Sequence, residues 1–338
     1  MTAPWLRGFL LAGLLLPAAS AAAQSIETTL TAFGKPARIA VAGLTAEEAE
    51  PAIRAAANAL REAERLANPS SQDELTLGAL NFGAGGGPRR LDDRLITLLE
   101  RSLSFCEWSR GATGPLGGEL LALWGSARPQ LAVPAPAEAA AAAARASCDR
   151  LRLTVAKSSA EIPDGSRADL RGFAFGWAVD AATEALRSGG AKTGMVQLGP
   201  VARAFGPGPQ GKGWRVTPPQ VPGLEPPIPP IELLDVAYAS ASALDGELRA
   251  GNEIFAPYVD QRTGQPVTGV LAVLVLTELA VDAQGLAGTL FVTGSFEGQR
   301  RLGLLQPRPH VLWAIGSGTA PPLLVEYRWS SFFRGTRD

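Results

Sequence analysis

Histidine and cysteine are almost missing from this chain. Its 338 residues include one histidine, His310, and two cysteines, Cys106 and Cys148. Zinc sites built from several histidines or thiolates are therefore excluded. His310 precedes an apolar stretch and is interpreted as a residue at the edge of a strand. The two cysteines either form a disulfide or remain buried free thiols, and both alternatives stay open.

An excess of charge of either sign is also missing. The formal net charge is −1, from 31 basic and 32 acidic residues. A protein that binds nucleic acid through its phosphates needs a basic surface, so no nucleic-acid partner is expected. No stretch after the first 24 residues is long and apolar enough for a stable membrane span.

The first residues have the pattern of a secretory signal peptide. Arg7 supplies a positive charge, residues 9–17 form a short apolar core, and Ala21-Ala22-Ala23 offers a small-residue cleavage site. We therefore expect cleavage after Ala23 and a soluble mature chain that is periplasmic or secreted. No cysteine follows the site, so a lipid anchor is not expected.

Helical and strand patterns alternate unevenly along the rest of the chain, which favours an α+β fold. A capping box at Thr45 begins the first helix, unless Pro51 is its true first position. We expect helices at about 45–66, 91–108, 138–145, 172–187 and 279–293. We expect a first strand that ends at residue 41. Further strands are expected at 152–155, 195–198, 214–216, 269–277 and 310–315.

The most informative segment is 169–180, Asp-Leu-Arg-Gly-Phe-Ala-Phe-Gly-Trp-Ala-Val-Asp. An acidic entry, a glycine turn and a following helix form a pocket of backbone N–H groups that suits a phosphate. Ordinary turn chemistry explains the same glycines equally simply, so this segment alone does not establish a binding site.

Four blocks, taken in order, resemble the ApbE family of FAD:protein FMN transferases. They are residues 111–125, 169–180, 260–266 and 282–294, within a match that runs from about 33 to 316. The resemblance implies a mixed two-lobed α+β fold with a cleft between the lobes. Together with the signal pattern and the composition, it divides the chain into a leader at 1–23, one domain at 24–316 with a Pro/Gly-rich insertion near 206–230, and a C-terminal extension at 317–338.

The resemblance implies a reaction in which FAD and Mg²⁺ bind and FMN is joined to a Thr or Ser of an acceptor protein. It places FAD beside Ala112, Thr113, Gly114, Asp169, Gly172, Phe175 and Arg262. For Arg262 a bond to Asp260 or to a turn carbonyl is the simpler expectation, and Phe175 could stack on the flavin or belong to the core.

The sequence departs from the family at the reactive positions. The family histidine falls on Pro257, so no catalytic base is assigned. The metal positions fall on Gly172, Gln284, Ala287 and Gly288. Asp282 lies two residues before the metal-binding position at Gln284, so on a helix it is expected to face away from the metal site. One carboxylate, Asp169, makes a poor Mg²⁺ site.

Three interpretations follow from these departures. The chain is either an exported flavin transferase with a rearranged site, or a periplasmic pseudoenzyme that keeps the fold and possibly flavin binding. A purely structural, partner-binding role is a third alternative. Metal-dependent transfer is expected to return only if Gln284→Asp, Gly288→Thr and Gly114→Asp are combined.

Overall fold

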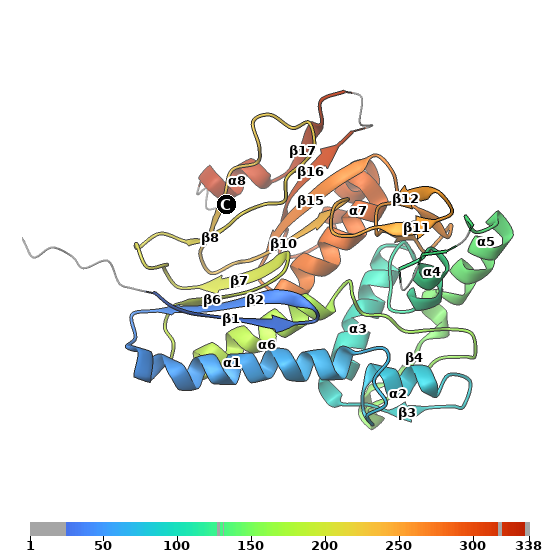
Figure 1. Cartoon of the computed structure of the whole chain (residues 1–338), viewed down its shortest axis with the longest axis horizontal. Coiled ribbons are helices and arrows are strands. Elements are labelled where there is room, and N and C mark those ends of the chain that lie inside the picture. Colours follow the sequence, from blue (N-terminus) through green and yellow to red (C-terminus); the bar gives the residue numbers. More distant parts are fainter. Residues whose placement is uncertain (1–24, 127–128, 131, 317–319, 335–338) are drawn as a thin grey trace, which may run out of the picture.

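An eight-stranded antiparallel sheet forms the larger of two lobes in the computed structural model, which describes residues 25–126, 129–130, 132–316 and 320–334 (Figure 1). The predicted leader lies outside these residues. In spatial order the strands are β1 (Ser25–Ala32), β2 (Lys35–Ala42), β6 (Gly194–Leu198), β7 (Val201–Phe205), β10 (Ala237–Ser242), β15 (Val270–Thr277), β16 (His310–Ile315) and β17 (Leu323–Tyr327).

Three long helices pack on one face of this sheet (Figure 1): α1 (Ala46–Ala67), α6 (Ala174–Ser188) and α7 (Ala280–Leu302). The opposite face is covered by the β8–β9 hairpin (Trp214–Val216 and Ile231–Leu233) and by α8 (Trp329–Arg334). The central strand β15 is therefore buried on both faces. Val273 and Val275 face the helices, whereas Leu274 and Leu276 belong to the second core. This explains its nearly continuous apolar sequence.

The smaller lobe is mostly helical (Figure 1). Its elements are α2 (Leu77–Phe82), β3 (Arg89–Arg90), α3 (Asp93–Trp108), α4 (Gly118–Leu123), α5 (Pro136–Arg145), η1 (Cys148–Arg150), β4 (Arg152–Thr154), η2 (Val155–Lys157), β5 (Ser159–Glu161), β11 (Leu248–Ala250), β12 (Glu253–Phe255), β13 (Val259–Asp260) and β14 (Gln265–Pro266).

Two residues of the 169–180 segment fix the crossing of α6 and α7. Gly176 lies against the backbone of α7, where a Cβ atom would come within 2.6 Å of Val281 Cα. Asp180 accepts hydrogen bonds from the N–H groups of Ala280 and Val281, each at 2.9 Å, and so caps α7. Burial raises the pKa of Asp180, and Arg203 opposes that shift from 2.9 Å.

Most elements expected from local signals are confirmed. The Thr45 capping box is formed and α1 begins at Ala46, with Pro51 inside the helix. The helix expected to end at Thr293 is interrupted at Gly294 (φ 70°, ψ 178°) before α7 continues to Leu302. Strand β8 lies at 214–216 as expected, inside the Pro/Gly-rich insertion.

The C-terminal segment joins the sheet through β17, which pairs with β16. Within the described part of the chain, none of the helices has the length and hydropathy needed to cross a membrane.

Candidate functional site

A cleft of about 920 Å³ lies where the two lobes meet. Its walls come from the β1–β2 turn, the C-terminal end of α1, the loop at 113–117, the start of α6, the segment after β10 and one side of α7. Thr113, Gly114, Asp169, Gly172 and Phe175 all line this cleft, as the sequence predicts for a common site.

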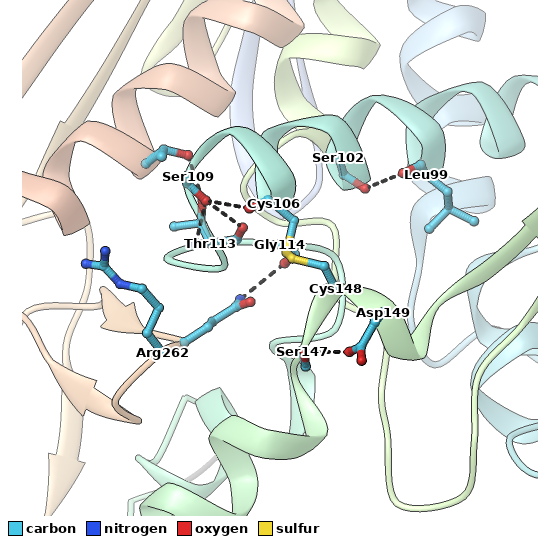
Figure 2. Close-up of a disulfide and its surroundings, with 12 residues drawn as sticks. Leu99, Ser102, Cys106, Ser109, Thr113, Gly114, Ser147, Cys148, Asp149 and Arg262 are labelled. Carbon is cyan, nitrogen blue, oxygen red and sulfur yellow. Dashed lines mark hydrogen bonds between the residues drawn. A yellow bond between two sulfur atoms is a disulfide. The ribbon is translucent and has the colours of Figure 1, made fainter. Parts of the chain in front are cut away.

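A disulfide holds the 112–114 loop at the edge of the cleft. Cys106, near the end of α3, is bonded to Cys148, which resolves the open question about the two cysteines. Figure 2 shows Gly114 directly beside this bridge. A Cβ atom at position 114 would lie 2.9 Å from Cβ of Cys106 and closer still to its Sγ atom. A side chain at Gly114 would collide with Cys106 of this bridge, so Gly114→Asp is sterically disfavoured as part of the expected three-residue rescue.

Thr113 is fixed by hydrogen bonds on both sides of the loop. Its hydroxyl is 2.6 Å from that of Thr289 on α7, and its backbone N–H donates to the Ser109 hydroxyl at 3.3 Å. Gln261 donates to the Gly114 carbonyl at 3.2 Å. The loop is thus connected to three parts of the fold, and its threonine hydroxyl borders the cleft.

Asp169 is bound by Arg171 of its own turn. The carboxylate accepts the Arg171 backbone N–H at 2.9 Å, and the guanidinium Nη2 donates to it at 2.7 Å. The Asp169 side chain is only 9% exposed, whereas that of Arg171 is 52% exposed. A carboxylate with a bidentate guanidinium partner is poorly available to a metal ion.

Gln284 links α7 to the beginning of α6. Its Oε1 atom accepts the N–H of Gly176 at 2.8 Å, and its Nε2 atom donates to the carbonyl of Arg171 at 2.9 Å. Both ends of the amide are therefore occupied by the protein backbone. The position at which the resemblance places a metal-binding aspartate serves here as a hydrogen-bonded link.

The remaining metal positions contribute no side-chain oxygen. Gly172 and Gly288 line the cleft without side-chain donors, and Ala287 is buried. Asp282 faces away from the cleft, as expected, and pairs with Arg101 of α3 at 2.7 Å. Among the described residues there is no group of three or more His, Cys, Asp or Glu that could hold a metal ion. These residues do not fit Mg²⁺, which needs near-octahedral oxygen coordination.

Aromatic side chains form an apolar part of the cleft. Phe33, in the β1–β2 turn, lies 5.3 Å from Phe175 between ring centroids. Tyr258 stacks on Phe291 of α7 at 4.1 Å. Phe33, Phe175 and Tyr258 line the cleft, so they offer flat surfaces for a planar ring system.

A carboxylate that the sequence did not single out, Asp245, also faces the cleft. Its Oδ2 atom accepts the Ser242 N–H at 2.7 Å and the Tyr258 hydroxyl at 2.8 Å. Solvent reaches Asp245 from the cleft, but the surrounding walls remove enough water to raise its pKa, and Lys35 partly opposes this. Desolvation also raises the pKa of Tyr258.

Asp245 lies close to the position of the family histidine. A Cβ atom on the adjacent Gly246 would be 3.9 Å from Cβ of Pro257. The Leu-Asp-Gly run at 244–246 was the available signal, since Asp-Gly after a strand indicates a turn with an exposed acid. A turn alone, however, does not show which cavity the acid faces.

Two predicted cofactor contacts lie outside the cleft lining. Ala112 is fully buried, and its carbonyl accepts the Gln261 N–H at 3.1 Å. Arg262 donates to Asp260 at 2.7 Å and to Glu297 at 3.1 Å, which agrees with the simpler expectation for it.

Trp124 donates to the Gly264 carbonyl at 2.7 Å and so joins two of the sequence blocks.

Comparison with known proteins gives a consistent result. The ApbE family profile matches residues 31–311. A Treponema pallidum protein named FAD:protein FMN transferase is 27% identical over 254 residues, covering 70% of this chain and 69% of its own length. A Haemophilus influenzae protein of the same name is 28% identical over 216 residues, and the match spans 61% of this chain and 62% of that protein.

Solved structures with this fold include the ApbE protein of Thermotoga maritima, with a TM-score of 0.80 and 22% identity, covering 92% of this chain and 99% of that one. The flavin transferase ApbE of Vibrio cholerae has a TM-score of 0.77 and 24% identity, with the same coverage of both chains. The predicted α+β, two-lobed architecture is therefore confirmed.

Proposed function

The chain belongs to the ApbE family, and we propose that it is an FAD:protein FMN transferase. It would join the FMN half of FAD to a threonine or serine of an acceptor protein. The observation that carries the proposal is the cleft of about 920 Å³ where Thr113, Asp169 and Phe175 meet. Its volume suits a large cofactor with an extended ring system.

The reaction breaks the phosphoanhydride bond between the two phosphates of FAD. The acceptor hydroxyl attacks the phosphorus of the FMN half, AMP leaves, and the hydroxyl loses its proton. A neutral alcohol is a weak nucleophile, so a nearby base must take that proton.

Asp245 is the candidate for this base. Its Oδ2 atom is held by two donors, whereas its Oδ1 atom accepts no hydrogen bond from the described residues. The raised pKa makes the carboxylate a stronger base than an ordinary exposed one. Its location beside Pro257 supports this assignment, because the family histidine is missing there.

The ring pair of Phe33 and Phe175 is the candidate surface for the isoalloxazine or adenine ring. Stacking on these rings would orient the dinucleotide and exclude water from one side of the cleft. The hydroxyls of Thr113 and Thr289 border the same space and can bind polar groups of the ligand. Mg²⁺ does not fit the residues present, so no step is assigned to it.

Export to the periplasm or the medium is part of the proposal. The leader pattern at residues 1–23 and the Cys106–Cys148 disulfide both support an oxidising compartment. Intact-mass measurement of protein from its native compartment tests this. A mass that still includes residues 1–23 would contradict it.

The function is tested with purified chain, FAD and an acceptor protein that presents a threonine. Covalent flavin on the denatured acceptor and an equal amount of released AMP are expected. Asp245→Asn should lower the rate of formation of both products about a hundredfold or more, whereas Asp73→Asn, which changes an exposed carboxylate on the surface, should leave it unchanged. Stoichiometric FAD binding without AMP release would instead support a second candidate.

That second candidate is a pseudoenzyme that binds flavin without transferring it. The observation in its favour is the loss of reactive groups at two family positions, where Pro257 and Gln284 now lie. A chain that binds neither FAD nor riboflavin would contradict both candidates.

A further inference from the structure

The chain repeats one local turn, Asp-x-Arg, with the same internal hydrogen bonds each time. In every copy the arginine N–H donates to the aspartate Oδ1 atom at 2.9 Å, and Nη2 donates to Oδ2 at 2.7 or 2.8 Å. The three copies are Asp92 with Arg94, Asp169 with Arg171, and Asp260 with Arg262.

The three turns differ in whether the arginine also binds a second carboxylate outside its own turn. Arg94 donates to a second acid, Glu62, at 2.9 Å, and Arg262 donates to Glu297 at 3.1 Å. Arg171 has no second acid among the described residues, although it lines the cleft and is half exposed. A guanidinium whose remaining N–H groups face a cavity indicates a place for an anion there.

A metal ion in such a cleft would have two physical effects. It would place positive charge beside the diphosphate, and it would connect α7 to the start of α6 through shared oxygen ligands. Here Gln284 already makes that connection by hydrogen bonds to Gly176 and to the Arg171 carbonyl. The link between α7 and the start of α6 therefore needs no cation. The positive charge beside the diphosphate must still come from another group.

We propose that this chain binds the diphosphate of FAD without a divalent cation, with Arg171 supplying the positive charge and Gln284 the link between α6 and α7. Lys35, which also lines the cleft and interacts electrostatically with Asp245, would add a second positive charge. This inference rests on the proposed function, because it concerns the same ligand and cleft.

The charges in the cleft are compatible with this assignment. Besides Lys35 and Arg171, four carboxylates line it: Glu64, Asp169, Asp245 and Glu247. Asp169 is paired with Arg171, and Glu247 is paired with Arg249 at 2.6 Å. Lys35 acts on the Asp245 carboxylate electrostatically and lowers its pKa against the effect of burial. The guanidinium can hold Asp169 through one edge and a phosphate through the other, because it has five N–H donors.

The test is titration of the purified chain with FAD and with riboflavin, each in the presence of EDTA or of excess Mg²⁺. Riboflavin carries the same ring without phosphate. FAD should bind in EDTA with a dissociation constant within about threefold of that in Mg²⁺. Arg171→Gln should weaken FAD binding about ten- to hundredfold, because a charged hydrogen bond is lost. Riboflavin binding should not change.

Arg94→Gln is the matched control, because it removes the same turn interaction away from the cleft. Arg171→Lys keeps a charge and should recover part of the FAD affinity. If Arg171→Gln weakened riboflavin binding equally, its role would be structural and the inference would be wrong.

FAD binding that requires Mg²⁺ would also overturn the inference while leaving the proposed transferase function intact. Unchanged FAD affinity in Arg171→Gln would overturn it in the same way. Failure to bind FAD under either condition would overturn both the inference and the proposed function.

Discussion

Breaking the Cys106–Cys148 disulfide should remove a large part of the stability of this chain. The bridge connects residues 42 positions apart, and the loop-entropy relation for a closed loop of that length gives about 4 kcal/mol. Domains are typically stable by only about 5–15 kcal/mol. Cys148→Ser is the appropriate change, because Cys148 is half exposed whereas Cys106 is fully buried in the core.

The native structure would also be affected near the cleft. Gly114 packs directly against Cys106, and the same loop carries Thr113, which contacts Thr289 across the cleft wall. Releasing Cys148 should loosen this loop, so FAD affinity should fall together with stability.

Urea denaturation monitored by tryptophan fluorescence measures the effect. The midpoint should fall in Cys148→Ser and in reduced wild-type protein, and the slope should rise because an unlinked denatured chain exposes more surface. Ser147→Ala, a neighbouring exposed position, is the control. A loss below about 1 kcal/mol, the size of an ordinary surface or cap effect, would refute the reasoning once thiol titration has shown that the bridge was present.

Four further outcomes are expected. Asp245→Asn should lower transfer about a hundredfold or more if the carboxylate is the base. Folding raises the pKa of Asp245, so its ionisation lowers the free energy of unfolding as the pH rises above the ordinary carboxyl pKa. In Asp245→Asn this pH-dependent loss should be absent when urea denaturation is compared at acidic and neutral pH. Gln284→Asp with Gly288→Thr should make FAD binding respond to Mg²⁺ in calorimetry, whereas either change alone should not, since a single added oxygen ligand leaves too few to replace the water shell of the cation. A Cβ atom at position 288 would meet the Tyr258 ring at 4.0 Å, an ordinary contact. Phe175→Ala should weaken riboflavin binding about tenfold, and quenching of flavin fluorescence on binding should decrease.

The sequence predicts the elements whose signals are local. The capping box at Thr45 marks the start of α1 because the cap requires only residues three apart. Gly294 marks the break in α7 because its φ of 70° suits glycine. The buried strand β15 is recognisable because both of its faces are apolar.

The elements that the sequence did not reveal depend on distant partners. Strand β10 consists largely of alanine and serine, so it has no clear alternation; it is buried because β7 and β15 pair with it on either side. Strand β1 at the sheet edge was missed for a similar reason, since its register is set by pairing with β2.

In the candidate site, too, some features could be predicted from the sequence and others depend on contacts between distant residues. The blocks that carry Thr113, Asp169 and Gln284 could be placed in one cleft because their order and sequences resemble those of the ApbE family. The contact between Gln284 and the Arg171 carbonyl could not, because 113 residues separate them. The exclusion of a side chain at Gly114 was equally hidden, since it depends on the disulfide beside it.

Arg171 and Gln284 meet at the turn that precedes α6. The Arg171 guanidinium holds Asp169, and the Arg171 carbonyl accepts the amide of Gln284, so in the proposed cation-free site each residue would supply part of what a cation would do. Arg171 lines the cleft beside Asp169, and both ends of the Gln284 amide are hydrogen-bonded to backbone groups. If FAD binds in EDTA and Arg171→Gln weakens that binding, these residues belong to a working anion site. If the chain binds no FAD, they belong to an empty scaffold.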